Sequence, residues 1–106
     1  MITEDDRRIL ETFARQLREV LPDAAVFGFG SRVNGTPDPE SDLDICVVVT
    51  QLNHAVREVI RDVAWHVGFD SGVVITTVKY ERGDFHHGPV SVSPLVQAIM
   101  AEGLAA

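Results

Sequence analysis

The sequence predicts a small α/β or α+β domain, in which helices pack on a short mixed β-sheet. Two observations favour this class. Segments whose apolar residues recur at three- and four-residue steps, as in amphipathic helices, alternate along the chain with short apolar runs of strand length. The chain has 106 residues and contains neither internal repeats nor a linker-like tract, so we expect a single domain over 1–106.

The apolar stripes predict three helices, which span 4–21, 52–67 and 94–103. Thr3 and Ser93 precede the first and third helices, where their hydroxyl groups can cap free backbone N–H groups. Pro22 ends the first helix because proline cannot continue it. Gly68 is predicted to close the second helix, since glycine is common directly after a helix end.

The runs between these helices predict three strands, at 24–29, 43–49 and 73–78. The second strand is apolar and β-branched enough to be buried, and only Asp44 interrupts it near its start. Two polar, turn-rich segments, 32–41 and 81–88, are predicted to be loops.

The charge of the chain argues against several classes of partner. Nine Lys and Arg residues oppose sixteen Asp and Glu, which gives a net charge of −7 and a surface that repels phosphate backbones. We therefore expect no direct nucleic-acid binding. The only cysteine, Cys46, cannot form an internal disulfide, no signal-peptide pattern opens the chain, and the apolar runs are too short to span a bilayer. These features predict a cytoplasmic location and no membrane association.

The chemically distinctive residues form the pattern Gly-Ser, ten residues, then Asp-x-Asp. Gly30 lets a phosphate approach the backbone because it has no side chain, and Ser31 can donate its hydroxyl to a phosphate oxygen. Asp42 and Asp44 are two residues apart at the start of a strand, so their carboxylates lie on one face. A hard cation such as Mg²⁺ would neutralise that pair and share its remaining positions with triphosphate oxygens. The pattern indicates phosphoryl or nucleotidyl transfer.

Each half of this pattern has an ordinary structural explanation. Gly-Ser is a common turn, and Asp-Leu-Asp can simply precede a strand that enters the core. Asp44 is harder to explain in this way because it lies in an apolar run, where an unpaired carboxylate is costly. The two halves together, each flanked by a predicted strand, favour a functional site.

At these residues the chain resembles the nucleotidyltransferase superfamily that includes DNA polymerase β, and more closely the minimal nucleotidyltransferase (MNT) proteins. The resemblance rests on Gly30-Ser31, the stretch 32–35 and Ser41-Asp42-Leu43-Asp44. It implies a fold like the polymerase β palm, Mg²⁺ on Asp42 and Asp44, and triphosphate contacts from Gly30 and Ser31. It also implies transfer of a nucleoside monophosphate, with AMP from ATP expected, to a hydroxyl group as pyrophosphate leaves.

Active members of the superfamily usually have a third carboxylate on a later strand, and here the sequence departs from the pattern. The predicted strand 73–78 contains no acidic residue. Asp70 precedes it and is the candidate base, although Ser71 can occupy the family position, and Asp70 can be a turn residue. Arg32 follows the phosphate cradle, so we expect either a phosphate contact or an exposed position.

Two functions remain open at this point. In the first, the chain modifies a small helical HEPN-type partner as the antitoxin of an MNT/HEPN toxin–antitoxin pair, as the resemblance implies. In the second, it is a catalytically degenerate module that binds nucleotide or neutralises its partner without chemistry. Homo- and hetero-oligomers are compatible with both. The pair His86-His87 is interpreted as part of a solvated loop, and Trp65 and Phe69 belong either to the core or to an exposed patch.

Overall fold

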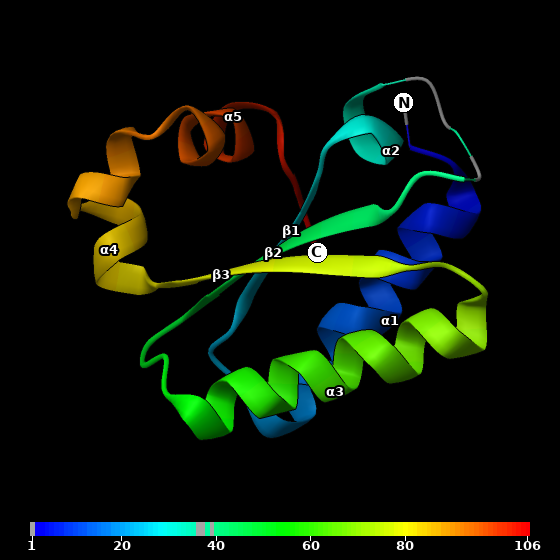
Figure 1. Ribbon diagram of the computed structural model, residues 1–106, viewed down its shortest axis with the longest axis horizontal. Coiled ribbons are helices and arrows are strands. Elements are labelled where there is room, and N and C mark those ends of the chain that lie inside the picture. The colour runs from blue at the N-terminus through cyan, green and yellow to red at the C-terminus, as the bar shows by residue number, and fades with distance from the viewer. Residues whose placement is uncertain (1, 36–37, 39) are drawn as a thin grey trace.

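The computed structural model describes residues 2–35, 38 and 40–106 (Figure 1). Its helices are α1 (Glu4–Val20), α2 (Ser31–Asn34), α3 (His54–Ser71), α4 (Arg82–His86) and α5 (Pro94–Glu102), with a 3₁₀ turn at Pro89–Val92. Its strands are β1 (Ala25–Phe29), β2 (Leu43–Val49), β3 (Ile75–Glu81) and β4 (Leu104–Ala105). The predicted class, a small mixed sheet with helices packed on it, is confirmed.

The strands form a mixed sheet in the order β3-β2-β1-β4. β2 pairs with β1 in the antiparallel direction and with β3 in the parallel direction, through the crossover helix α3. β4 adds to the outer side of β1. Helices α1 and α3 cover one face of the sheet, and α4 and α5 cover part of the other (Figure 1).

Strand β2 supplies buried side chains to both faces, as its apolar sequence predicts. Leu43, Ile45, Val47 and Val49 join a larger core with residues of α1 and α3. Cys46 and Val48 join a smaller core with residues of α4 and α5. Because side chains alternate along a strand, Asp44 belongs to the face of Cys46 and Val48. Asp44 therefore lies on the face of the sheet that α4 and α5 cover, near the N-terminal end of β2.

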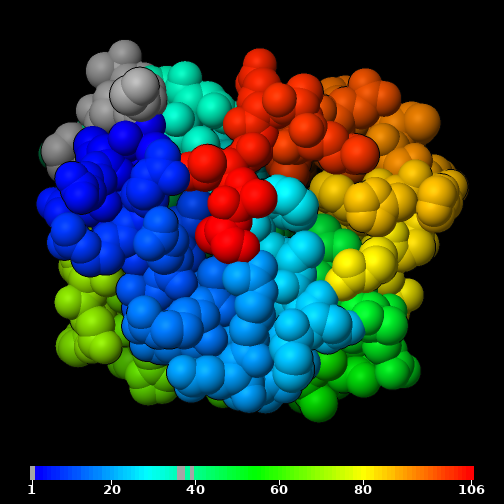
Figure 2. Space-filling model, turned by 180° about the vertical axis from the view of Figure 1, so that it is seen from behind, coloured from blue at the N-terminus to red at the C-terminus, as the bar shows by residue number. Residues whose placement is uncertain are grey.

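The first and last long helices begin as predicted. The Thr3 hydroxyl accepts a hydrogen bond from the Asp6 backbone N–H at the start of α1, and the Ser93 hydroxyl accepts one from Val96 at the start of α5. Arg18 of α1 donates to the carbonyl oxygens of Ala24 and Ala106, at 2.9 and 2.6 Å. Seen from behind, the C-terminal residues in red lie between α1 in blue and α5 in orange-red (Figure 2).

The predicted C-terminal end of the second helix was wrong. Gly68 does not close α3 but lies inside it, where a Cβ would come 2.6 Å from the Val73 carbonyl oxygen. The helix ends instead at Gly72, which adopts a left-handed conformation at φ 69° and donates to the Gly68 and Phe69 carbonyls. β3 consequently begins at Ile75 and runs to Glu81, later than predicted.

Both segments predicted as loops contain short helices. Residues 31–34 form α2, and residues 82–86 form α4, whose Phe85 is buried in the smaller core. Helices of one turn are too short to display an apolar period, which is why the sequence pattern misses them. The two-residue strand β4 was also missed. None of the helices in the described part of the chain is long and apolar enough to cross a membrane.

Candidate active site

Gly30 and Asp44 lie directly against each other at the junction of β1 and α2. Phe29 pairs with Asp44 across the β1–β2 ladder, and the chain turns at Gly30 with φ 81°. A Cβ on Gly30 would lie 2.3 Å from Asp44 Oδ2. Glycine is therefore required twice, by the positive φ and by the carboxylate above it. Because Gly30 has no side chain, this residue does not cover Asp44 Oδ2, which is next to the start of the predicted phosphate cradle.

Ser31 is the exposed first residue of α2, next to this glycine. A hollow of about 460 Å³ lies beside it, between α2 and α5. Its lining includes Phe29, Asn34, Leu95 and Glu102. The predicted phosphate cradle thus opens onto a space with an apolar floor and two polar side chains that can form hydrogen bonds.

Asp44 is near the start of β2, and Asp42 directly precedes the strand. Asp44 is half-buried, whereas Asp42 is exposed. Thr76 of β3 is the register partner of Asp44, and its hydroxyl donates to Asp44 Oδ1. One oxygen of Asp44 is thus engaged by Thr76 and the other faces Gly30. Sequence reasoning missed Thr76 because a lone threonine in a strand gives no signal before the register of β2 and β3 is known.

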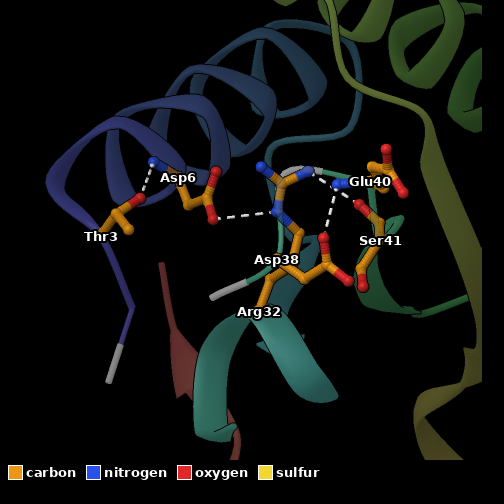
Figure 3. A network of polar contacts seen from close by, with 6 residues as sticks. All are labelled: Thr3, Asp6, Arg32, Asp38, Glu40 and Ser41. Carbon is orange, nitrogen blue, oxygen red and sulfur yellow. Dashed lines mark hydrogen bonds and ion pairs between the residues drawn. The ribbon is translucent and has the colours of Figure 1, made fainter. Parts of the chain in front are cut away.

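Arg32 does not reach toward the cradle. Its side chain is buried, with Nε donating to Asp6 Oδ2 at 3.0 Å and Nη1 donating to the Ser41 carbonyl at 2.8 Å (Figure 3). The predicted alternatives, a phosphate contact or an exposed position, are both replaced by a structural role. The guanidinium joins α1, α2 and the residue before Asp42.

Short-range contacts also hold Asp38, Glu40 and Ser41, which precede the aspartates. Asp38 accepts a hydrogen bond from the Glu40 backbone N–H through its carboxylate and one from the Ser41 N–H through its carbonyl (Figure 3). Together with Arg32, these contacts determine where Ser41 lies. The position of Asp42 follows, because it is the next residue.

Asp70 is not brought to the other site residues. It is exposed near the end of α3, a helix that packs on the opposite face of the sheet from Asp44. The adjacent Ser71 lines a shallow hollow with residues of α1. The structure therefore gives no support to Asp70 as the base, and Thr76 occupies the strand position beside Asp44.

The donor set suits a magnesium ion that completes its shell with substrate. Carboxylates of Asp42 and Asp44 are the ligands that this ion prefers, and it retains several positions for water and phosphate oxygens. Among the described residues, no group of three or more His, Cys, Asp or Glu side chains is placed to hold a metal. Asp42 and Asp44 would therefore hold the ion together with the triphosphate, and His86 and His87 belong to no such group.

Cys46, two residues beyond Asp44, belongs to the core and not to the site. It is fully buried, and burial raises the pKa of its thiol to about 12. A thiol that stays protonated is a poor nucleophile and a poor metal ligand.

The fold and these residues define a domain of the nucleotidyltransferase class. The family described as nucleotidyltransferase domain matches residues 8–88, so the chain belongs to this family. The structure is similar to a crystal structure of a mutant of the toxin–antitoxin MntA-HpeT, with a TM-score of 0.61. The sequences are 19% identical, and the match covers 94% of this chain and 70% of the other. A search of curated proteins gave no significant match. The predicted nucleotidyltransferase family is therefore confirmed.

Proposed function

We propose that the chain is a Mg²⁺-dependent nucleotidyltransferase that transfers AMP from ATP to a hydroxyl group of a partner protein. The observation that supports this proposal is the close approach of Gly30 and Asp44, because the carboxylate proposed to bind Mg²⁺ is then next to the glycine proposed to bind phosphate. When bound, the ion would neutralise charge and polarise the phosphates. Ser31 supports the triphosphate, and the hollow beside α5 has room for the nucleoside.

In the proposed reaction the hydroxyl oxygen of the acceptor forms a bond to the α-phosphorus, and the bond to the pyrophosphate oxygen breaks. Asp42 and Asp44 would hold the ion, and Gly30 and Ser31 would orient the triphosphate for this displacement. Thr76 holds one oxygen of Asp44 and so restricts the rotation of its carboxylate. The proton of the acceptor hydroxyl passes to water, because Asp70, the base expected from the sequence, lies on the opposite face of the sheet.

We further propose that the acceptor lies on a small helical HEPN-type protein and that the chain acts as its antitoxin. Two observations support this role. The family is that of nucleotidyltransferase domains, and a structural neighbour is a toxin–antitoxin protein. A hydroxyl on a protein surface is an acceptor that needs no deep pocket, which suits the open surroundings of Asp42.

A second function is favoured by one specific feature. Thr76 stands beside Asp44 where a third carboxylate would lie, so the domain can bind Mg²⁺ and nucleotide without efficient transfer. In that case it neutralises its partner by binding alone.

The test is incubation of the purified protein with Mg²⁺ and α-labelled ATP in a lysate of its native host. We expect a labelled protein band with the wild type and none with the double variant Asp42→Ala/Asp44→Ala. Asp62→Ala, an exposed aspartate on α3, is the matched control and should label normally.

Two results decide between the functions. Equal labelling by the wild type and the double variant would end the proposal of transfer at this site. No labelling with any of the four nucleotides, together with Mg²⁺-dependent ATP binding that the double variant loses, would identify the binding module.

A further inference from the structure

The outer edge of β3 and the adjacent side of α3 form a second surface, on the side of the sheet opposite Asp44. In the part of the chain that the structure describes, β3 pairs only with β2, so the other edge of β3 offers unpaired backbone groups. Helix α3 runs alongside β3 (Figure 1). We call this the β3 edge surface, and it consists of β3 together with Arg57, Arg61, Trp65, Phe69 and Val74.

One end of the β3 edge surface is apolar. Trp65 and Phe69 are 63% and 73% exposed, and their rings stack with centroids 5.2 Å apart. Val74, just before β3, is 64% exposed. A hollow of about 370 Å³ lies between these side chains and Ile75. Large apolar side chains gathered around a hollow are typical of a protein-binding surface.

The other end is basic. Lys79 of β3 is half-buried on the α3 side of the sheet, and burial together with the guanidinium groups of Arg57 and Arg61 lowers its pKa. Arg61 pairs with Glu58, whereas none of the described carboxylates pairs with Arg57 or Lys79. Lys79 and Arg57 therefore lie close together, next to the paired Arg61, in a chain of net charge −7, and an incoming carboxylate would relieve the repulsion between them.

The two ends have a defined spacing along the strand. Ile75 and Lys79 are four residues apart on β3, so their side chains share the α3 face and their Cα atoms are about 13 Å apart. A strand added to this edge follows the same two-residue alternation. Its carboxylate opposite Lys79 and its apolar residue opposite Ile75 would thus be four positions apart as well.

We propose that the β3 edge surface binds an extended acidic and apolar segment of a partner protein by antiparallel strand addition. The segment carries a carboxylate and, four residues later, a large apolar side chain that enters the hollow beside Trp65. Backbone hydrogen bonds supply the affinity, and these two side chains supply the specificity. This docking needs neither nucleotide nor metal and goes beyond the transfer reaction.

The probe is a capped peptide as long as β3, with 7 residues of alternating threonine and valine in which the second is replaced by glutamate and the sixth by phenylalanine. Trp65 is the only tryptophan, so its emission reports contact at the hollow directly. We expect a saturable blue shift of this emission on titration of the full chain. A peptide with the two side chains three positions apart should bind at least about tenfold more weakly, because they then lie on opposite faces.

Charge reversal tests the basic end. Lys79→Glu should weaken binding at least about tenfold, and a peptide with lysine in place of glutamate should restore it. Phe69→Ala should also weaken binding, while circular dichroism confirms that each variant is folded. Asp44→Asn should bind the peptide like the wild type, which separates this inference from the proposed transfer.

Three outcomes would overturn the inference. One is the absence of any emission shift at millimolar peptide, and another is equal affinity for the two peptide spacings. The third is a concentration-dependent dimer that Phe69→Ala disrupts, in a chain that binds no peptide, because the occupant would then be a second copy.

Discussion

Arg32 and Asp6 form a buried ion pair that joins α2 to α1, with Nε and Oδ2 3.0 Å apart. The side chains of these residues are 9% and 4% exposed. The same guanidinium holds the Ser41 carbonyl, one residue before Asp42. Arg32, which follows Gly30-Ser31 in the sequence, therefore positions Ser41, the residue before Asp42.

Removal of one member of this pair should be strongly destabilising. We expect Arg32→Met to lower the free energy of unfolding by about 3–5 kcal/mol, because it leaves the Asp6 carboxylate buried without its partner. The double variant Arg32→Met/Asp6→Leu should be more stable than Arg32→Met. Urea titration monitored by circular dichroism measures both.

The exposed pair of Arg8 and Asp5 provides the matched control, because its side chains are 70% and 87% exposed. Arg8→Met should change stability by less than about 1 kcal/mol. Equal losses of unfolding free energy in Arg8→Met and Arg32→Met would show that the contribution of the Arg32–Asp6 pair to stability does not depend on its burial.

Gly30→Ala should abolish nucleotide binding. The new methyl group would clash with Asp44 Oδ2. Alanine would also have to adopt the positive φ of Gly30, which is strained for a residue with a side chain. Gly72→Ala is the control, since Gly72 also has a positive φ but nothing lies within 4 Å of its Cβ position. It should reduce stability by about 1–2 kcal/mol and leave ATP binding intact. Calorimetric titration with ATP and Mg²⁺ measures the difference, and loss of binding in both variants would point to backbone strain alone.

Thr76→Asp should strengthen the response to Mg²⁺. A carboxylate at this position would lie beside Asp44 and add a third ligand, although without metal the two like charges destabilise the fold. Thermal unfolding with and without Mg²⁺ should show a larger metal-dependent rise in melting temperature for Thr76→Asp than for the wild type. Thr76→Val removes the hydroxyl only and should show no such gain. An unchanged response in Thr76→Asp would place the ion away from this strand.

Cys46 should make the protein lose stability as the pH rises above about 9, the ordinary pKa of its thiol. In the unfolded chain the thiol loses its proton above this pH, whereas burial raises the pKa of the folded state to about 12. The unfolded state therefore binds fewer protons between these two values. The free energy of unfolding should fall by up to about 1.4 kcal/mol per pH unit between these values. Urea titrations of the wild type and Cys46→Ala from pH 8 to pH 10.5 check this, because the variant lacks that contribution. Parallel pH profiles would contradict it.

The arrangement of the candidate site was predictable from the sequence where it depends on local chemistry. Glycine at a positive φ and paired acidic residues at a strand start leave a pattern in neighbouring residues, and Gly30 and Asp44 are indeed in contact. The role of Arg32 was not predictable in this way. It depends on Asp6, which is 26 residues away and becomes its neighbour only when α1 packs against the sheet.

The fold was likewise predictable only where local sequence patterns determine it. Apolar periods predicted the long helices and the central strand, but the end of α3 was misplaced because Gly68 was interpreted as a cap. Its actual function is close packing against Val73, a contact between the helix and the segment that follows it, which no local pattern encodes. β4 is two residues long and exists only because β1 offers it an edge, so it leaves no signal of its own.

The pairing of β1 has a consequence for biosynthesis. β1 lies between β2 and β4, and β4 is made after every other strand and helix of the domain. A nascent chain that has emerged only as far as α5 therefore carries an uncovered strand edge, and Arg18 lacks its contact with Ala106. Such edges recruit other strands. Ribosome-stalled chains of this length should therefore bind chaperones more strongly than stalled chains in which β4 has also emerged.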